Sequence, residues 1–287
     1  MDGTHSSAYD RQDKGFKSRI VHAVLLLFTC ATTLVAGAIQ QGINPLEEPG
    51  QIWRGIPFSF TLLFILGSHE LGHFFMSRRY RVEVSLPYFI PAPSFIGTFG
   101  AFIKMKSPIP DRKALFDIGV AGPLSGLVAA IPVVITGLVL SDIVPVNTGE
   151  GIILGDSLLF SFLSWIVHGP IPKNLDIALH PVAFSGWIGL FVTNLNLLPV
   201  GQLDGGHVIY SLFGPKQKTI GRTVLIILVI LGFASWTGWL VWAFLLILLG
   251  TRHPPVVYDW IPLDKKRRIL GWFVLVIFIL TFMPAPF

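Results

Sequence analysis

The sequence predicts an all-α membrane protein with about seven transmembrane helices and a small membrane-associated β-hairpin region after the second helix. Of its 287 residues, 52% are hydrophobic and 13% are charged, whereas an ordinary soluble domain is about 25% charged. Mostly apolar runs of about 20 residues, the length that crosses roughly 30 Å of hydrocarbon, recur along the chain. Lysine and arginine gather in alternate connecting segments, as expected of cytoplasmic loops. Together these features exclude a soluble enzyme, a disordered chain and a fibre.

The predicted spans follow from the apolar runs, taken in order along the chain. The run Thr219–Gly250 is too long for one helix and is interrupted at residues 234–238, so we expect two short spans there. The apolar stretch Ile152–His168 carries Asp156 and lies between glycine and proline residues, and we expect an interfacial or re-entrant segment on the outer side. The remaining predicted spans are Ile20–Ile39, Ile56–Ser77, Ile118–Leu140, Pro181–Leu198 and Ile269–Met283.

The distribution of positive charge selects one topology. Seven crossings with a cytoplasmic N-terminus place 19 lysine and arginine residues inside and only Arg54 and Lys173 outside. If residues 152–168 crossed the membrane, the split would be 12 against 9. If residues 219–250 formed one span, it would be 14 against 7. The predicted location is a prokaryotic inner membrane or an organelle membrane.

The organisation that follows has four parts. Residues 1–19 form a cytosolic tail, residues 20–54 the first span with its outer loop, residues 55–215 a core, and residues 216–287 the C-terminal spans.

No basic tract with interleaved aromatic residues is present, so we expect no nucleic-acid partner. The one cysteine lies inside an apolar run, so we expect no disulfide framework. No feature of the sequence indicates an oligomeric state.

The motif His69-Glu70-Leu71-Gly72-His73 lies inside the second predicted span. Titratable residues are costly within a membrane and usually functional there. On a helix, His69 and His73 project from one face and can bind the same metal ion. Glu70 lies about 100° around the helix, where it can take a proton from the water that zinc activates. The alternative, a structural polar cluster, would leave a glutamate without a partner in an apolar span.

A third ligand is predicted far along the chain. Tetrahedral zinc in an enzyme needs three protein ligands and an open position, and Asp204 supplies a carboxylate at the inner end of a span. Pro199 and Gly201 should break the helix before it, and broken helices at membrane depth line cavities. The spans that carry His69 and Asp204 run in the same direction, which predicts ligands in one layer of the membrane.

The two motifs resemble those of the site-2 proteases, a family of intramembrane zinc metalloproteases. The pattern N-x-x-P-x-x-x-L-D-G runs from Asn196 to Gly205, and residues 121–126 resemble a family helix more weakly. The resemblance covers about residues 55–215. It implies that His69, His73 and Asp204 ligate one Zn²⁺ ion, that Glu70 is the general acid and base, and that Asn196 steadies the scissile peptide or the oxyanion. No stretch is long enough for a PDZ domain, so we expect a compact member of the family.

Residues 82–106 combine proline and glycine with apolar and β-branched residues, which predicts short strands and turns. In the resembling family this region is a β-hairpin that dips toward the active site. An edge strand there could hold an unwound substrate in an extended form. A plain loop is the alternative interpretation.

The leading hypothesis is an endopeptidase that cuts membrane-tethered proteins or peptides in or near their transmembrane segments, with the lipid bilayer as its other partner. Such cleavage would serve regulated proteolysis or the clearance of signal-peptide remnants. A zinc transporter usually shows an internal repeat or a polar path along the chain, and neither is evident. An inactive scaffold would be free to lose Glu70. His207, three residues after Asp204, could support the metal ligands or be a spare ligand, but we expect an ordinary interfacial histidine. We assign no role to the segment Arg252–Pro255.

Overall fold

The computed structural model describes residues 4–146 and 153–287, with side chains from Arg19 onward. Residues 1–3 of the predicted tail and Ile152, the first residue of the predicted outer segment, lie outside the described residues. The described chain is mainly helical, as predicted. Its helices are α1 (Thr4–Gln40), η1 (Pro49–Gly55), α2 (Ile56–Arg79), α3 (Arg112–Val139), α4 (Leu158–His168), α5 (Pro181–Asn196), α6 (Asp204–Phe213), η2 (Gly214–Lys216), α7 (Gln217–Ala234), α8 (Gly238–Leu249) and α9 (Lys265–Thr281).

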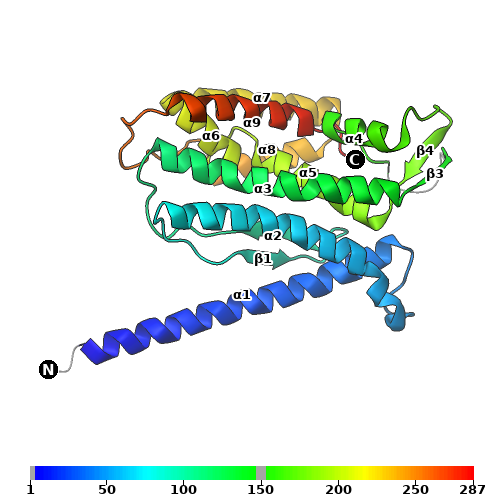
Figure 1. The fold of residues 1–287 in the computed structure, drawn as a ribbon, viewed down its shortest axis with the longest axis horizontal. Helices are drawn as coiled ribbons and strands as arrows, with labels where there is room; N and C mark the ends of the chain where they lie inside the picture. The colour runs from blue at the N-terminus through cyan, green and yellow to red at the C-terminus, as the bar shows by residue number, and fades with distance from the viewer. Residues whose placement is uncertain (1–3, 147–152) are drawn as a thin grey trace.

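The helices pack side by side along the long axis of the molecule (Figure 1). Helices α2 and α3 lie together at the centre, α7 and α9 lie at one edge, and α1 leaves the opposite edge at an angle. Packing between α2, α3 and α5 is the most extensive in the described chain. The fully buried side chains Phe58, Leu62, Ile65, Trp187 and Leu190 fill this region. The core therefore lies between the helices that carry both predicted motifs.

The predicted β-hairpin is confirmed. Strands β1 (Tyr88–Pro91) and β2 (Thr98–Phe102) pair antiparallel, with Tyr88 opposite Phe102. The hairpin packs between α1 and α2 (Figure 1), where Thr32 Oγ1 of α1 donates a hydrogen bond of 2.6 Å to Gly97 O in the turn. This placement holds the hairpin beside the helix that carries His69.

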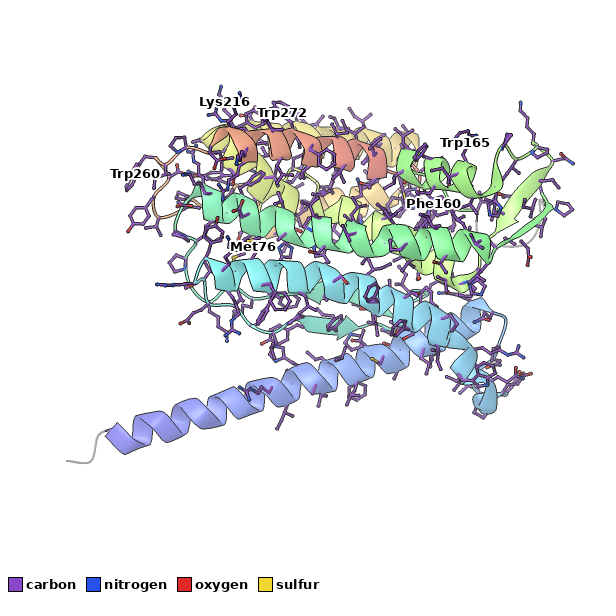
Figure 2. The ribbon with its side chains drawn as sticks, in the orientation of Figure 1. Met76, Phe160, Trp165, Lys216, Trp260 and Trp272 are labelled. Atoms are coloured by element: carbon purple, nitrogen blue, oxygen red, sulfur yellow. The ribbon has the colours of Figure 1, made fainter. Side chains whose placement is uncertain are left out.

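A second hairpin was not predicted. Strands β3 (Asp142–Pro145) and β4 (Leu175–Ala178) pair antiparallel at one end of the molecule, and α4 stays at that end between them in sequence (Figure 1). Each strand has only four residues and their partners lie about 30 residues apart, so the pairing depends on the tertiary contacts around it. Figure 2 shows Trp165 projecting outward from α4, whereas Phe160 on the same helix is buried.

Three helical segments of the described chain are long and apolar enough to cross a membrane: Arg19–Gln40, Arg112–Val139 and Asp204–Ala234. Helix length and hydropathy therefore support three spans in the described chain, and the prediction of about seven spans is confirmed only in part. The polar motif in α2 lowers its hydropathy, and α5, α8 and α9 have only 16, 12 and 17 residues. The predicted interruption between residues 234 and 238 is present, because α7 ends at Ala234 and α8 begins at Gly238.

Candidate metal centre

The first two predicted ligands lie together on α2. His69 and His73 are one turn apart and are 4% and 7% exposed, and their Nε2 atoms are 3.2 Å apart. The Nδ1–H of His73 donates a 2.8 Å hydrogen bond to the carbonyl of Ile118 on α3, which leaves its Nε2 with a free lone pair. The two imidazoles therefore converge on a common point.

Asp204 reaches the same point from the other motif. Helix α5 ends at Asn196, residues 197–203 are not helical, and α6 begins at Asp204. Gly201 within this break has a φ of +56°, a conformation that favours glycine, so the predicted interruption of the helix is confirmed. The Oδ2 atom of Asp204 lies 3.2 Å from Nε2 of His69 and 3.2 Å from Nε2 of His73.

The donor set fits a zinc ion. The three atoms are all 3.2 Å apart, and ligands that are about 2.0–2.1 Å from one tetrahedral zinc stand roughly 3.3 Å from each other. Two nitrogen lone pairs and a carboxylate oxygen held this close repel one another unless a proton or a metal ion lies between them. His69 and His73 are buried, Asp204 is half-buried, and the three form a group of potential ligands for one metal ion.

Glu70 lies beside this group and is 5% exposed. It follows His69 on α2, and a backbone hydrogen bond from Ile103, just after β2, reaches its carboxylate. Its position leaves it outside the set of three converging atoms. A buried carboxylate adjacent to a metal site is placed for proton transfer.

Asn196 also points at the cluster. Its Nδ2 lies 3.2 Å from Nε2 of His69, and because an amide NH₂ only donates while a metal would take the lone pair of that nitrogen, the N–H of Asn196 is available to another acceptor in the site. The structure therefore brings together Glu70, Asn196 and the three predicted ligands from two motifs that lie more than 120 residues apart.

Glycines on one face of helix α3 contact the cluster. In the sequence, residues 121–126 of this helix showed only a weak resemblance to a family helix. A Cβ at Gly122 would lie 2.1 Å from Nε2 of His73, and a Cβ at Gly126 would lie 3.1 Å from Nδ1 of His69. A Cβ at Gly119, on the same face of the helix, would lie 2.8 Å from Cβ of His207. Three histidines thus pack against one face of α3 because that face lacks side chains.

His207 and His253 form a contact that sequence reasoning did not anticipate. Nδ1 of His207 on α6 lies 2.7 Å from Nε2 of His253, in the segment between α8 and α9. The signal available in the sequence was the position of His207 three residues after Asp204, together with the unexplained segment that contains His253.

Comparisons with known proteins agree with this geometry. The family model for peptidase family M50 matches residues 57–237. Over 259 residues the chain is 33% identical to the probable zinc metalloprotease EGY1, chloroplastic, of Arabidopsis thaliana, covering 84% of this chain and 46% of that protein. It is 29% identical over 277 residues to the Arabidopsis probable zinc metalloprotease EGY2, chloroplastic, covering 92% and 48%. With the EGY1 protein of Oryza sativa subsp. japonica it shares 38% identity over 167 residues, covering 55% and 28%.

The chain belongs to peptidase family M50, the family of the site-2 proteases, and the resemblance drawn from the two motifs is confirmed. His69, His73 and Asp204 lie close enough together to hold one metal ion. The chain spans about half the length of the Arabidopsis relatives it matches.

Proposed function

We propose that this protein is a zinc-dependent intramembrane endopeptidase that hydrolyses peptide bonds in or near the transmembrane segments of membrane-tethered substrates. The observation that carries the proposal is the convergence of His69, His73 and Asp204 at 3.2 Å, with the buried Glu70 on the same turn of α2 as the two histidines. Membership of peptidase family M50 and the names of the plant relatives support it.

The residues divide the chemistry between them. His69, His73 and Asp204 would hold one zinc ion, which when bound supplies Lewis-acid chemistry that polarises a carbonyl group and acidifies water. Glu70 removes the proton from the attacking water and delivers it to the nitrogen of the leaving amine. The amide of Asn196 donates a hydrogen bond to the carbonyl oxygen of the scissile peptide, where negative charge develops.

In the proposed reaction, the β1–β2 hairpin keeps the substrate in an extended conformation. A peptide bond in a transmembrane helix is shielded by its own backbone hydrogen bonds, so the substrate must unwind before cleavage. We propose that the β1–β2 hairpin holds the unwound segment by strand addition. The hydrogen bond between Ile103 and Glu70 joins the end of this hairpin to the proposed base.

The proposed topology is seven crossings with a cytoplasmic N-terminus, in a prokaryotic inner membrane or an organelle membrane. It is supported by the 19-to-2 division of lysine and arginine residues and by the path of the chain in Figure 1, where α4 stays with β3 and β4 at one end of the bundle. The chloroplastic names of the plant relatives favour an organelle.

The experiment compares wild-type protein with Glu70→Gln, purified in detergent, using a reporter with a helix-destabilised transmembrane segment. Bound zinc is measured beside cleavage. Glu70→Gln should retain one zinc ion per chain and lose cleavage by a factor of about 10² to 10⁴, the range that general acid–base catalysis contributes. Glu47→Gln, an exposed glutamate in the loop after α1, is the matched control and should behave as wild type.

The remaining outcomes are also informative. Equal cleavage by wild type and Glu70→Gln would overturn the assigned role of Glu70. Zinc binding by the wild type without cleavage of any transmembrane reporter would overturn the endopeptidase and favour a zinc transporter or an inactive scaffold.

A further inference from the structure

The hydrogen-bond contacts of His253 determine which ring nitrogens of His253 and His207 carry protons. Nδ1 of His253 lies 2.5 Å from the carbonyl oxygen of Pro254, and a carbonyl only accepts hydrogen bonds. Nδ1 of His253 therefore carries a proton. In a neutral ring Nε2 of His253 is then an acceptor, and its partner, Nδ1 of His207, must be the donor.

The surroundings of His253 favour the neutral ring. Its side chain is buried, and burial lowers its pKa from the ordinary value. Its flat face stacks on Tyr210 with ring centroids 4.4 Å apart. The nearby carboxylate of Asp259 is already engaged by both nitrogens of the Arg112 fork, at 3.0 and 3.1 Å, and by the hydroxyl of Tyr210.

The proton positions of His253 also fix the tautomer of His207. Since the proton of a neutral His207 ring resides on Nδ1, its Nε2 is left as an unprotonated acceptor. His207 lies one turn after Asp204 on α6 and packs against the same glycine face of α3 as His69 and His73. His207 thus carries an acceptor nitrogen one turn after the proposed ligand Asp204, and it is not one of the three converging residues.

We propose that His207 supplies the active site with a hydrogen-bond acceptor for an N–H or O–H group of the bound substrate or of the attacking water, and that His253 is the positioning residue that fixes its tautomer. The proposal rests on the proposed endopeptidase function. It assigns a purpose to the segment Arg252–Pro255, since Pro254 O sets the proton of His253 and His253 sets that of His207.

The rest of the segment between α8 and α9 is built to hold His253 in place. The side-chain oxygen of Gln217 accepts a 3.2 Å hydrogen bond from the backbone of His253, and the side-chain nitrogen of the same residue reaches Thr251 O at 3.3 Å. Further along, the backbone nitrogen of Tyr258 donates a 2.7 Å hydrogen bond to Pro110 O, just before α3. The segment is therefore fixed to α7 and to the start of α3 on either side of His253.

The tautomer is tested directly by nitrogen NMR of protein labelled with ¹⁵N-histidine, in which protonated and unprotonated ring nitrogens resonate far apart. The signals of His207 are assigned by their loss in His207→Asn. The proposal requires a protonated Nδ1 and an unprotonated Nε2 at His207 in the wild type. A proton on Nε2 of His207 would overturn it.

The role of His253 is tested by two variants. His253→Phe keeps an aromatic ring to stack on Tyr210 but removes the acceptor, and it should lower kcat about 10- to 100-fold, as the loss of partners behind a metal site does. KM and the number of bound zinc ions should stay as in the wild type. His253→Gln, whose amide oxygen can accept from His207, should recover most of the rate. Tyr210→Phe on α6, which keeps the ring that stacks on His253 and loses only the hydroxyl that contacts Asp259, is the control and should keep the wild-type kcat.

The outcomes separate the two proposals. Equal loss of kcat in His253→Phe and His253→Gln, or a wild-type rate in His253→Phe, would overturn the positioning role. Failure of the wild type to cut the reporter while the tautomer is as stated would count against the endopeptidase, and the hydrogen-bond assignment would stand.

Discussion

At the scale of single residues, the centre depends on what is missing from α3 as much as on the ligands themselves. Interior glycine destabilises a helix by roughly 0.5–1 kcal/mol relative to alanine, yet α3 places Gly119, Gly122 and Gly126 along one face. Each allows a histidine to approach the helix backbone more closely than a side chain would permit. Gly122 and Gly126 leave space for the two proposed histidine ligands, and Gly119 leaves space for His207.

Gly122→Ala is therefore expected to abolish zinc binding. The new Cβ would lie 2.1 Å from Nε2 of His73, so the imidazole must leave the position from which it meets Asp204. Gly126→Ala should be milder, because its nearest atom is 3.1 Å away on the ring of His69. Bound zinc per chain, measured after purification, should fall in the order wild type, Gly126→Ala, Gly122→Ala.

The control for this series is Gly67→Ala on α2, where the added Cβ would meet only the end of the Phe89 ring at 3.8 Å. This variant should bind zinc as the wild type does. Full zinc occupancy in Gly122→Ala would show that α3 does not set the position of His73.

Asn196→Ala should separate binding of the metal from catalysis. Asn196 lies 3.2 Å from Nε2 of His69 but is not one of the three converging residues, so zinc content should persist. Removal of a donor at a developing oxyanion costs about 10² to 10³ in kcat. The matched control is Gln202→Ala, an exposed amide in the same break between α5 and α6. Loss of zinc in Asn196→Ala would instead assign this residue to holding His69.

Much of this site could be predicted from the sequence, because its parts are local. The spacing of His69 and His73 fixes their shared face on a helix, and Pro199 and Gly201 marked the break before Asp204. The contact between His207 and His253 could not be predicted, since it joins residues 46 positions apart through a folded loop. Neither histidine has a neighbour in sequence that specifies its partner.

At the scale of elements, an ion-pair network ties three helix ends together. Arg267 at the start of α9 donates to both oxygens of Asp117 on α3, at 2.6 and 2.8 Å, and to the hydroxyl of Tyr80 after α2 at 3.1 Å. Asp264 caps α9 by accepting from the backbone of Arg267 at 3.1 Å. These contacts connect α9 to the helices that carry the metal centre.

A double-mutant cycle on Asp117→Asn and Arg267→Gln should measure this connection. Each single change should lower the free energy of unfolding by about 1–2 kcal/mol, since the hydrogen bonds involve charged groups that are partly exposed. The double change should cost less than the sum, with a coupling energy of about 1 kcal/mol. Thermal unfolding in detergent provides the readout. Arg268→Gln, exposed on α9, should change stability by less than about 0.5 kcal/mol, and additive effects of the two changes would contradict the network.

Elements were predictable where local patterns determine them. Glycine and proline in residues 82–106 indicated the first hairpin, and the interruption near Trp236 separated α7 from α8. Strands β3 and β4 are four residues each and lie on either side of α4. Such short runs carry too little alternation to stand out, and tertiary packing decides their pairing.

At the scale of the whole molecule, apolar side chains remain on the outward faces. Leu27 of α1, Val128 of α3 and Phe233 of α7 are all more than half exposed. In water this surface would be an aggregation hazard, whereas in lipid it is the ordinary exterior. Helices α8 and α9, with 12 and 17 residues, are shorter than a full span. The predicted number of crossings therefore rests on the distribution of lysine and arginine in the flanking segments, and cysteine labelling tests it.

The single cysteine of the chain makes that test simple. On a Cys30→Ser background, single cysteines replace the exposed residues Lys106, Lys173, Thr237 and Lys266, and a membrane-impermeant maleimide is applied from either side. Seven crossings place positions 173 and 237 outside and positions 106 and 266 inside. A crossing by α4 would move positions 173 and 237 inside and 266 outside. A single span over α7 and α8 would move position 266 outside and bury position 237, so each alternative has its own labelling pattern.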